Sequence, residues 1–366
     1  MYLRDLELDN FRNFKEFSNS FAPGVNLIYG ENGAGKTNLL EAIYYLTILR
    51  SHRGRRDDEL IRFDSDFFRI SATAVKGKNT SRFEVTYSQE RIPHKKVLID
   101  GSSAERLSSI MGRFRGVILS LDDVSLVSGP PYWRRRFLDI LLSAISSSYL
   151  ADIIAYRRVL QQRNKQLWEM KVNSKKNIDL LESWDSQLVE LGARIAFKRD
   201  EVSRDLFRVV RRLCPSMGID SEVRLSYLPS FPLENPIENT FRERLTRERR
   251  RELKRGQTLV GPHRDDIRIL FNGRDLRRFG SSGQQRLVAV AMKFAEATLL
   301  NDLYNDSPVL MLDEVLVELD LQTRERVLDR LKSYSQIFVA SASHLELDGS
   351  HVTHYTLRNG VLEWKE

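Results

Sequence analysis

The sequence predicts an α/β fold with an inserted, mainly helical second lobe, and three observations support this. The apolar run Val25 to Tyr29 is followed by a glycine-rich loop and then by a helical pattern. A second apolar run, Val309 to Leu312, ends in two acids. Long helical periodicity fills the middle of the chain from about Tyr132. The expected domains are an α/β domain of residues 1–130 plus 256–366 and an inserted helical lobe of residues 131–255.

The N-terminal part of the α/β domain is rich in strand signals. Short alternating or β-branched segments are separated by turn residues, and the last of them ends at the Asp100-Gly101 hairpin signal. The predicted strands are Leu3 to Leu8, Val25 to Tyr29, Phe68 to Val75, Arg82 to Tyr87 and Val97 to Ile99. We therefore expect this part to be mostly sheet.

The inserted lobe carries the pattern of a long helix packed on another helix. Apolar residues recur in steps of four and three, except that the charged residues Lys198 and Arg199 stand where one apolar residue is expected. They are Trp184, Leu188, Leu191, Ile195, Val202, Leu206, Val209 and Leu213. At about 1.5 Å per residue such a helix is roughly 50 Å long. A helix from about Ala151 to Met170 is expected to fold back on it as an antiparallel arm.

Strand and helix signals return in the C-terminal part. The segment Leu228 to Pro236 contains three prolines and is predicted to be a linker or an irregular loop. After it we expect strands at Thr258 to Val260, Ile267 to Phe271, Val309 to Leu312 and Gln336 to Ala340, and a helix from about Gly283 to Leu300.

Composition indicates a folded protein of the cytoplasm. The chain of 366 residues is 41% hydrophobic and 30% charged, and no run approaches the roughly 18 apolar residues of a membrane-spanning helix. Acids occupy the first ten residues where a signal peptide carries basic residues. The single cysteine, Cys214, excludes an internal disulfide framework, which fits a reducing compartment.

The net charge of +8 is concentrated in two stretches. Residues 134–212 contain 17 Lys and Arg against 10 Asp and Glu, and residues 241–255 contain 8 against 3. These surpluses of +7 and +5 exceed the total, so the rest of the chain is about −4. Localised positive charge favours a polyanion partner, but a solvated arginine-rich helix surface explains it equally well.

The glycine-rich loop has the pattern of a phosphate-binding loop. The residues Gly30, Glu31, Asn32, Gly33, Ala34, Gly35, Lys36 and Thr37 match G-x-x-x-x-G-K-[ST] and lie between a predicted strand and a predicted helix. Backbone N–H groups can converge on phosphate oxygens there, and Lys36 can reach the β- and γ-phosphates. The Thr37 hydroxyl is a candidate ligand for Mg²⁺. We therefore predict an ATP site.

The two acids after the second apolar run complete this site. Asp313 is predicted to hold Mg²⁺, together with Thr37. Glu314 is predicted to orient or deprotonate the water that attacks the γ-phosphate, and Lys36 is its catalytic neighbour. Such acids are a weak signal alone, but they become a strong one with the loop upstream.

A third motif resembles the LSGGQ signature of ABC ATPases. Gly280 precedes Ser281, Ser282, Gly283 and Gln284, at the start of a predicted helix and shortly before Asp313. In ABC-type proteins this segment binds the γ-phosphate of the partner's ATP, so the resemblance implies a head-to-tail homodimer with ATP at its interface. Glu318, Leu319 and Asp320 resemble the D-loop of the same superfamily, which reaches the opposing site.

Three further strings resemble the RecF family of ABC/SMC-type ATPases. Asn10 to Phe14 is similar to the start of RecF and SMC heads, where the arginine, here Arg12, approaches the phosphates. Gly129 to Asp139 is similar to the segment that leads into the RecF helical lobe, and Gly261 to Asp266 resembles the GPHRDD turn of that family. The resemblance covers about Asn10 to Asp320.

What the resemblance implies is an ATP-dependent DNA clamp of recombinational repair and replication-fork recovery. It implies a weak, DNA-stimulated ATPase that uses ATP and Mg²⁺, dimerises on ATP, and binds gapped or single-strand–double-strand DNA without sequence preference. The implied partner is a RecR-type recombination mediator, and the implied task is to help load recombinase. The arginines proposed to contact DNA are Arg134, Arg135, Arg136, Arg157, Arg158, Arg211 and Arg212.

Some positions depart from the family pattern. Glu314 stands where RecF proteins more often carry Asp, and Val317 replaces a Ser that commonly precedes the D-loop. His344 is a candidate for the switch histidine of ABC transporters, but it falls late. His263 either fixes a turn or acts near the nucleotide. Arg53, after the first helix, is a further candidate near the nucleotide by position alone.

Other function classes share parts of this pattern. The nucleotide-binding subunit of an ABC-type transporter is the chief alternative, but the helical insert, the GPHRDD turn and the concentrated basic charge argue against it. An SMC head carries a far longer coiled coil than this insert. A nuclease of the overcoming-lysogenization type carries an additional acidic domain that has no counterpart here.

Overall fold

The computed structural model divides the chain into two compact units. Unit 1 comprises Met1–Asp123, Arg212–Asp220 and Leu287–Glu366, and unit 2 comprises Val124–Arg211 and Ser221–Arg286. The structure describes residues 1–104, 110–173, 178–343, 345 and 351–365. Residues 256–286 belong to unit 2. The prediction from the sequence placed them in the α/β domain. The two-lobe division at residues 130 and 255 stays a prediction.

One six-stranded sheet of unit 1 is antiparallel, with the order β2-β1-β4-β5-β6-β7. Its strands are β1 (Tyr2–Phe11), β2 (Phe14–Ser20), β4 (Phe67–Lys76), β5 (Asn79–Ser88), β6 (Lys95–Ile99) and β7 (Ser102–Ser103). Along β1 the alternate residues Leu6 and Leu8 are fully buried, as expected where one face covers a core. The sheet-rich N-terminal part predicted from the sequence is therefore confirmed.

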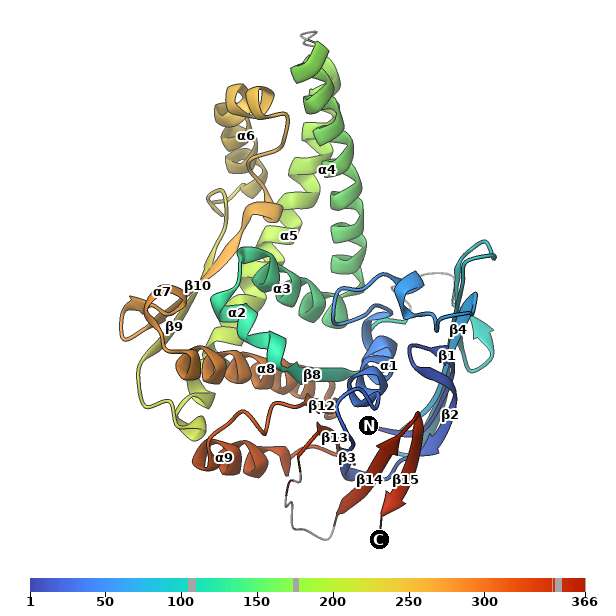
Figure 1. Ribbon diagram of the computed structural model, residues 1–366. Helices are drawn as coiled ribbons and strands as arrows, with labels where there is room; N and C mark the ends of the chain where they lie inside the picture. Colours follow the sequence, from blue (N-terminus) through green and yellow to red (C-terminus); the bar gives the residue numbers. More distant parts are fainter. Residues whose placement is uncertain (105–109, 174–177, 344, 346–350, 366) are drawn as a thin grey trace. The chain divides into compact units, whose positions relative to one another are not determined.

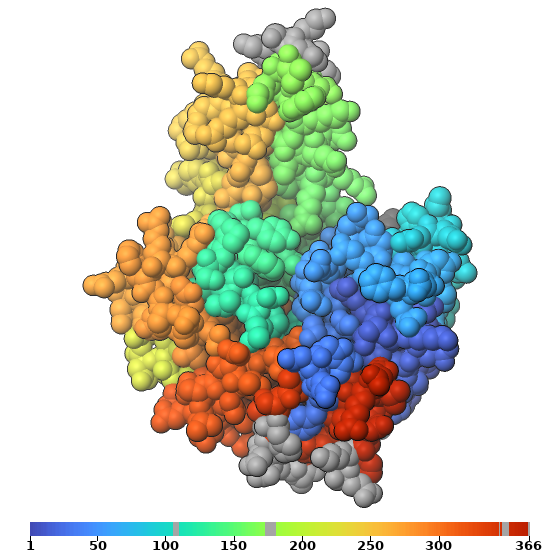
Figure 2. Space-filling model, viewed as in Figure 1, coloured from blue at the N-terminus to red at the C-terminus, as the bar shows by residue number. Residues whose placement is uncertain are grey.

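The other six-stranded sheet of unit 1 is mainly parallel, with the order β15-β14-β3-β13-β12-β8. Its strands are β3 (Gly24–Tyr29), β8 (Gly116–Ser120), β12 (Val309–Asp313), β13 (Gln336–Ser341), β14 (Val352–Arg358) and β15 (Val361–Lys365). All residues of β12 and β13 are buried, which explains their continuous apolar runs. Figure 2 shows the first and last parts of the chain, blue and red, side by side in unit 1, as the pairing of β3 with β14 requires.

Helix α1 (Lys36–Ile48) shares one hydrophobic core with both sheets of unit 1 (Figure 1). Ten of its 13 residues are buried, so it follows β3 as an almost fully enclosed helix. The helix α8 (Ser282–Tyr304) begins in unit 2 and continues into unit 1. Among the described residues, the other helical segments that lie wholly or partly in unit 1 are η1 (Asp57–Leu60), η3 (Leu121–Val124), η4 (Pro215–Met217) and α9 (Leu321–Leu331).

Unit 2 is mainly helical and contains a small sheet with the order β11-β10-β9. Its strands are β9 (Val223–Leu228), β10 (Asp266–Phe271) and β11 (Arg274–Asp275). Its helical segments are α2 (Ser125–Ser128), α3 (Pro131–Ile145), α4 (Ser147–Asn173), α5 (Ile178–Leu213), α6 (Ile237–Arg255), η5 (Pro262–Arg264) and α7 (Leu276–Phe279). Helix α5 extends into unit 1 over its last residues.

Helices α4 and α5 form the predicted antiparallel arm. Arg163 pairs with Asp185 and Asp152 pairs with Arg194, so positions rise along one helix as they fall along the other. Figure 1 shows the two helices side by side. The predicted seam is confirmed, since all eight of its residues are buried or half-buried. Arg199 lies at the position where the apolar repeat is interrupted, and its side chain is only 2% exposed.

One predicted strand is wrong. Residues Thr258 to Val260 form no strand, because side chains satisfy the backbone there: Asn164 accepts from the Thr258 N–H at 2.7 Å, and Glu252 accepts from the Leu259 N–H at 2.8 Å. The strand at Ile267 to Phe271 is confirmed as β10, and the irregular proline segment follows β9.

Among the residues that the structure describes, no helix combines the length and the hydropathy needed to cross a lipid bilayer.

Candidate functional site

The loop from Gly30 to Thr37 joins the buried strand β3 to the N-terminus of α1. Gly35 ends this loop with a φ of 108°, and a Cβ there would overlap the side chain of Asn13. That side chain donates to the Ala34 carbonyl at 3.3 Å and accepts from Asn38 at 2.8 Å. The β1–β2 turn therefore supports the loop directly through Asn13, a contact that the sequence pattern did not reveal.

Lys36 lies under the loop with a side chain that is 5% exposed. Its Nζ donates to the carbonyls of Gly30 at 2.8 Å and Glu31 at 3.2 Å, and it lies 3.3 Å from a Glu314 carboxylate oxygen. The ammonium group is therefore held at the mouth of the loop, where a phosphate-binding lysine is expected.

Thr37 and Asp313 meet at the start of α1 and the end of β12. The Thr37 hydroxyl donates to the Asp313 carboxylate across 3.0 Å. Two adjacent oxygen ligands of Mg²⁺, each at about 2.0–2.1 Å in octahedral geometry, lie about 2.9 Å apart. The pair therefore fits the predicted metal site. Burial raises the pKa of Asp313 to about 6, and the Thr37 hydrogen bond opposes this shift.

No cluster of three or more His, Cys, Asp or Glu side chains suited to a metal occurs among the described residues. A Mg²⁺ site built from one hydroxyl, one carboxylate, phosphate oxygens and water needs no such cluster. The predicted ligands Thr37 and Asp313 are compatible with this kind of site.

Glu314 follows Asp313 with a φ of 58°, a left-handed conformation that costs a non-glycine residue roughly 1–2 kcal/mol. Its carboxylate accepts the Ala342 N–H at 3.0 Å beyond the end of β13, and it pairs with Lys36. Strained backbone of this kind clusters at functional sites. The segment after β13 therefore positions Glu314, whereas the candidate His344 lies outside the described residues.

Arg12 is held by a buried acid. Its Nε and Nη2 donate to the Glu41 carboxylate at 2.9 and 3.1 Å, and its Nη1 donates to the Glu59 carbonyl at 3.0 Å. Glu41 is fully buried on α1 and also accepts the Ser51 hydroxyl. Sequence reasoning missed Glu41, although an acid within an apolar helix was a signal that could have found it.

Arg53, the further candidate of the sequence, lies close enough to act on the site. Its positive charge lowers the pKa of Asp313, in opposition to burial. Its backbone N–H donates to the Ser51 hydroxyl oxygen at 3.1 Å. The segment after α1 therefore lies beside the Thr37–Asp313 pair that is predicted to bind the metal.

The signature segment caps the start of α8 in unit 2. The Ser281 N–H donates to the Gln284 side chain at 2.9 Å, and the Gln284 N–H donates back to the Ser281 hydroxyl at 3.2 Å. This reciprocal capping box holds the helix N-terminus open to solvent. Ser282 and Gly283 are exposed beside it. The segment can therefore present backbone N–H groups to an anion.

Asp320 caps α9 by accepting the Thr323 N–H at 3.0 Å, and this hydrogen bond lowers the pKa of Asp320. The apolar side chains of Val317 and Leu321 flank it and are 36% and 72% exposed. Of the predicted D-loop, Glu318 and Asp320 are exposed and Leu319 is buried.

His263 belongs to the folded framework of unit 2. Its Nδ1 accepts the Tyr156 hydroxyl at 2.8 Å, and its Nε2 donates to the Thr258 carbonyl at 3.2 Å. Burial lowers the pKa of His263 to about 3. Asp265 is fully buried and accepts the Ser230 N–H at 2.8 Å. Of the two predicted roles, these contacts support fixing the turn.

The predicted DNA-contacting arginines differ in availability. Arg134 is 3% exposed and pairs with Asp266, so it has no surface left for a phosphate. Arg135 donates to the Asp265 carbonyl at 2.8 Å, Arg157 pairs with Asp139 at 3.0 Å, and Arg136 lies over Trp133. The exposed ones with no ion pair among the described residues are Arg158, Arg211 and Arg212.

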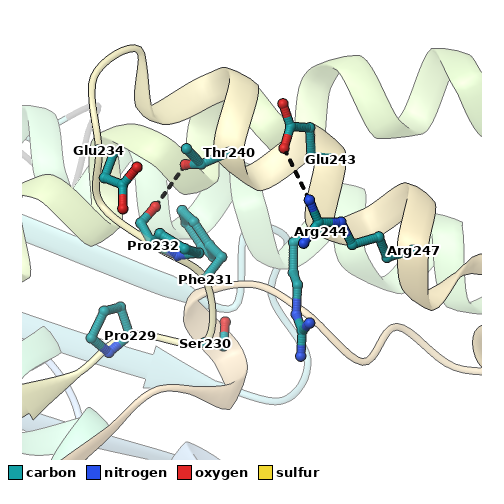
Figure 3. Close-up of a pocket in the computed structure, with 9 residues that line it drawn as sticks. All are labelled: Pro229, Ser230, Phe231, Pro232, Glu234, Thr240, Glu243, Arg244 and Arg247. Atoms are coloured by element: carbon teal, nitrogen blue, oxygen red, sulfur yellow. Dashed lines mark hydrogen bonds and ion pairs between the residues drawn. The ribbon is translucent and has the colours of Figure 1, made fainter.

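A cavity of about 570 Å³ lies in unit 2, away in sequence from the phosphate-binding loop. Figure 3 shows Arg244 and Arg247 of α6 facing the proline-containing segment that begins at Pro229. Glu234 and Glu243 also line it, so its charge is mixed.

The chain resembles known proteins over nearly its whole length. The profile of the RecF/RecN/SMC N-terminal domain matches residues 2–359. The DNA replication and repair protein RecF of Bacillus subtilis (strain 168) is 34% identical over 365 residues, which is 98% of this chain and 96% of that protein.

Solved structures of RecF and of Smc head domains resemble the chain. One is the structure, solved with ATP, of RecF, a recombination mediator protein of the RecFOR pathway. It matches with a TM-score of 0.91 and 33% sequence identity, and the match covers 100% of this chain and 98% of that one. An Smc head domain derived from Pyrococcus furiosus, bound to the C-terminal domain of ScpA, matches with a TM-score of 0.53 and 16% identity over 100% of this chain and 96% of that one. The fold is thus that of the SMC-type ATPase heads, and the chain belongs to the RecF family.

Proposed function

We propose that this chain is an ATP-dependent DNA clamp of recombinational repair and replication-fork recovery. The observation that carries the proposal is the group formed by Lys36, Thr37, Asp313 and Glu314 around the mouth of the phosphate-binding loop. The likeness to RecF solved with ATP supports the same nucleotide here.

Each residue of this group has a task in binding ATP. The loop amides and Lys36 hold the phosphates at the N-terminus of α1. Thr37 and Asp313 would hold Mg²⁺, which would neutralise negative charge on the phosphates. Arg12 uses three of its five N–H groups on Glu41 and Glu59, and the remaining two are directed to phosphate in our proposal.

Glu314 is the residue proposed to drive hydrolysis. It accepts a proton from the water that attacks the γ-phosphorus, the bond to the β-phosphate oxygen breaks, and ADP and inorganic phosphate leave. The Ala342 N–H fixes the carboxylate at 3.0 Å. Slow, DNA-stimulated turnover is expected, because the rate of hydrolysis sets how long the ATP-bound conformation lasts.

ATP closes a homodimer in this proposal. Ser281 to Gln284 of one protomer bind the γ-phosphate held by the loop of its partner, and the D-loop around Asp320 lines the same interface. The exposed helix N-terminus of α8 supports the first contact, and the exposed Val317 and Leu321 support the second. ADP lacks the γ-phosphate that bridges the protomers, so it leaves the dimer open.

The proposed macromolecular partners are gapped or single-strand–double-strand DNA and a RecR-type recombination mediator. The names of the relatives support a role in DNA replication and repair and in the RecFOR pathway. Contacts by Arg and Lys to phosphates make binding independent of sequence. Arg158, Arg211 and Arg212 are retained as candidate contacts. The transporter alternative gains no support, since the RecF likeness covers nearly the whole chain.

The test is DNA binding to a gapped duplex with ATP or ADP, for the wild type and Lys36→Met. We expect retention on DNA with ATP alone, and its loss in the variant, because Lys36 holds the phosphates. If ATP dimerises the wild type but the protein ignores DNA at low salt, the ATPase head stands and the DNA-repair proposal fails.

A further inference from the structure

We propose that the solvent-facing side of helix α6 is a second contact surface for a nucleic-acid backbone, located in unit 2. The proposal rests on the proposed DNA-binding function and assigns part of it to residues outside the arginines already named. We call this surface the α6 face, defined by Arg242, Arg244, Arg247, Arg250, Arg251, Lys254 and Arg255, all of which are exposed.

Helix α6 is amphipathic, with buried residues on one side and basic residues on the other. Ile237, Phe241 and Leu245 are buried, and the stripe continues through Glu248 and Glu252, at the spacing of one side of a helix. Phe241 stacks on Phe231 with ring centroids 4.1 Å apart. The apolar side therefore packs against unit 2, and the basic side remains outside.

The two buried acids of α6 neutralise only part of its outer side. Glu252 is fully buried and accepts Arg163 at 2.7 Å and the Leu259 N–H at 2.8 Å. Glu248 is also buried, and it pairs with Arg244 at 3.5 Å and with Arg251. A count of charges along the sequence hides this separation. Only Glu238 and Glu243 are exposed acids of the helix, all of whose residues are described.

Four cations of the α6 face have no ion-pair partner among the described residues: Arg242, Arg250, Lys254 and Arg255. By contrast, Arg134 and Arg157, predicted from the sequence to contact DNA, already pair with Asp266 and Asp139. The exposed cations of unit 2 without an ion pair therefore include these four residues of α6, beside Arg158 and Arg211.

A nucleic-acid backbone fits this face better than a protein surface does. No large hydrophobic side chain is exposed from Ile237 to Arg255, a stretch that is described throughout, whereas protein interfaces centre on apolar or aromatic anchors. Residues four apart on a helix are about 6 Å apart along its axis. Successive phosphates of one strand are about 3.4 Å apart along the duplex axis, so such pairs reach roughly every second phosphate.

The neighbouring cavity is not the proposed contact. Arg244 and Arg247 line it together with Glu234 and Glu243, and Arg247 pairs with Glu243 at 3.5 Å (Figure 3). Two cations facing two carboxylates attract a phosphate weakly. The proposal therefore depends on the unpaired cations of the outer face.

The experiment measures the affinity for gapped duplex with ATP at about 50 to about 200 mM salt. The test variant is R242Q/R250Q/R255Q. The control is K198Q/R204Q/R208Q, which removes the same charge from α5, where Lys198, Arg204 and Arg208 each pair with an acid of their own helix. Thermal unfolding checks that both variants remain folded.

The expected result is a smaller salt dependence in the test variant alone. Loss of three phosphate contacts lowers the slope of log K against log salt by about 2.7. The advantage of the wild type over the variant then shrinks about 40-fold between the two salt concentrations. The control keeps the slope of the wild type.

Two negative outcomes are distinguishable. If the wild type itself ignores DNA, the proposed function fails and this inference fails with it. If the wild type binds DNA and the folded test variant shows the same slope, the DNA-binding function stands, the inference is overturned, and the α6 face is assigned to an acidic protein surface instead.

Discussion

Glu314 combines a strained backbone with two contacts that orient its carboxylate. Lys36 lies 3.3 Å from one oxygen, and the Ala342 N–H donates to the other at 3.0 Å. Asp313 and Glu314 lie beside the loop because parallel strands end at one edge of a sheet, and the roles predicted for them from the sequence stay predictions. The sequence could not reveal Ala342, whose contact depends on how the segment after β13 turns.

Replacing Glu314 by Gln should separate ATP binding from ATP hydrolysis. The amide keeps the shape of the side chain but cannot accept a proton, so we expect the turnover rate to fall about 10²–10⁴-fold. The affinity for ATP should change little, and ATP-dependent dimers should persist longer. Steady-state hydrolysis and equilibrium ATP binding measure the two quantities. Glu325→Gln, on the exposed side of α9, is the matched control, and equal losses in both variants would contradict the assignment.

Protonation of His263 should destabilise the protein in acid. Burial lowers the pKa of His263 to about 3, whereas an unfolded chain has a value of about 6.5. The folded state therefore binds fewer protons between these values, and the free energy of unfolding falls by about 1.4 kcal/mol for each pH unit lost in that window.

The measurement is urea unfolding at about pH 7 and about pH 5. Between these two pH values, the free energy of unfolding of His263→Gln should fall by about 2 kcal/mol less than that of the wild type. His351 is exposed, and His351→Gln should lose as much as the wild type does. The same acid sensitivity in all three proteins would show that His263 does not titrate with folding.

At the scale of elements, periodicity predicted the long helix α5 and the fold-back of α4 correctly. It missed α6 and the strands β14 and β15. The outer side of α6 is so rich in arginine that its sequence shows charge more clearly than amphipathicity. Strand β14 is stabilised by pairing with β3, which lies more than 300 residues earlier in the sequence. Only tertiary contacts between distant segments determine such elements.

Gly192 tests the packing of α5 on its neighbours. A Cβ there would overlap the ring of Phe241 on α6 and lie 3.2 Å from the ring of Tyr156 on α4. We expect Gly192→Ala to lower the free energy of unfolding by about 1–3 kcal/mol through overpacking, although Ala favours helix by about 1 kcal/mol.

Chemical denaturation measures this change. Gly283→Ala is the control for stability, because a Cβ there meets only the Ser281 hydroxyl, at 3.9 Å. That variant should be as stable as the wild type or more stable. A stabilising effect of Gly192→Ala would show that the three helices pack less closely at this point.

For the whole molecule, both chain ends contribute strands to one sheet of unit 1, so the α/β class followed from motifs placed near the two ends. The lobe boundary at residue 255 stays a prediction, since residues 256–286 combine irregular turns, short strands and short helical segments with little periodicity. The GPHRDD turn identified the family from the sequence, but its buried contacts through Asp265 and His263 appear only in the folded unit.

The central claim is that each nucleotide site is shared between two protomers. The most direct test mixes the variants Lys36→Met and Ser281→Arg and measures ATP hydrolysis. Each variant alone has a defect at both sites of its homodimer and should be inactive. A mixed dimer contains one site with both an intact Lys36 and an intact Ser281, so the mixture should regain hydrolysis. A mixture no more active than its separate components would contradict the shared site.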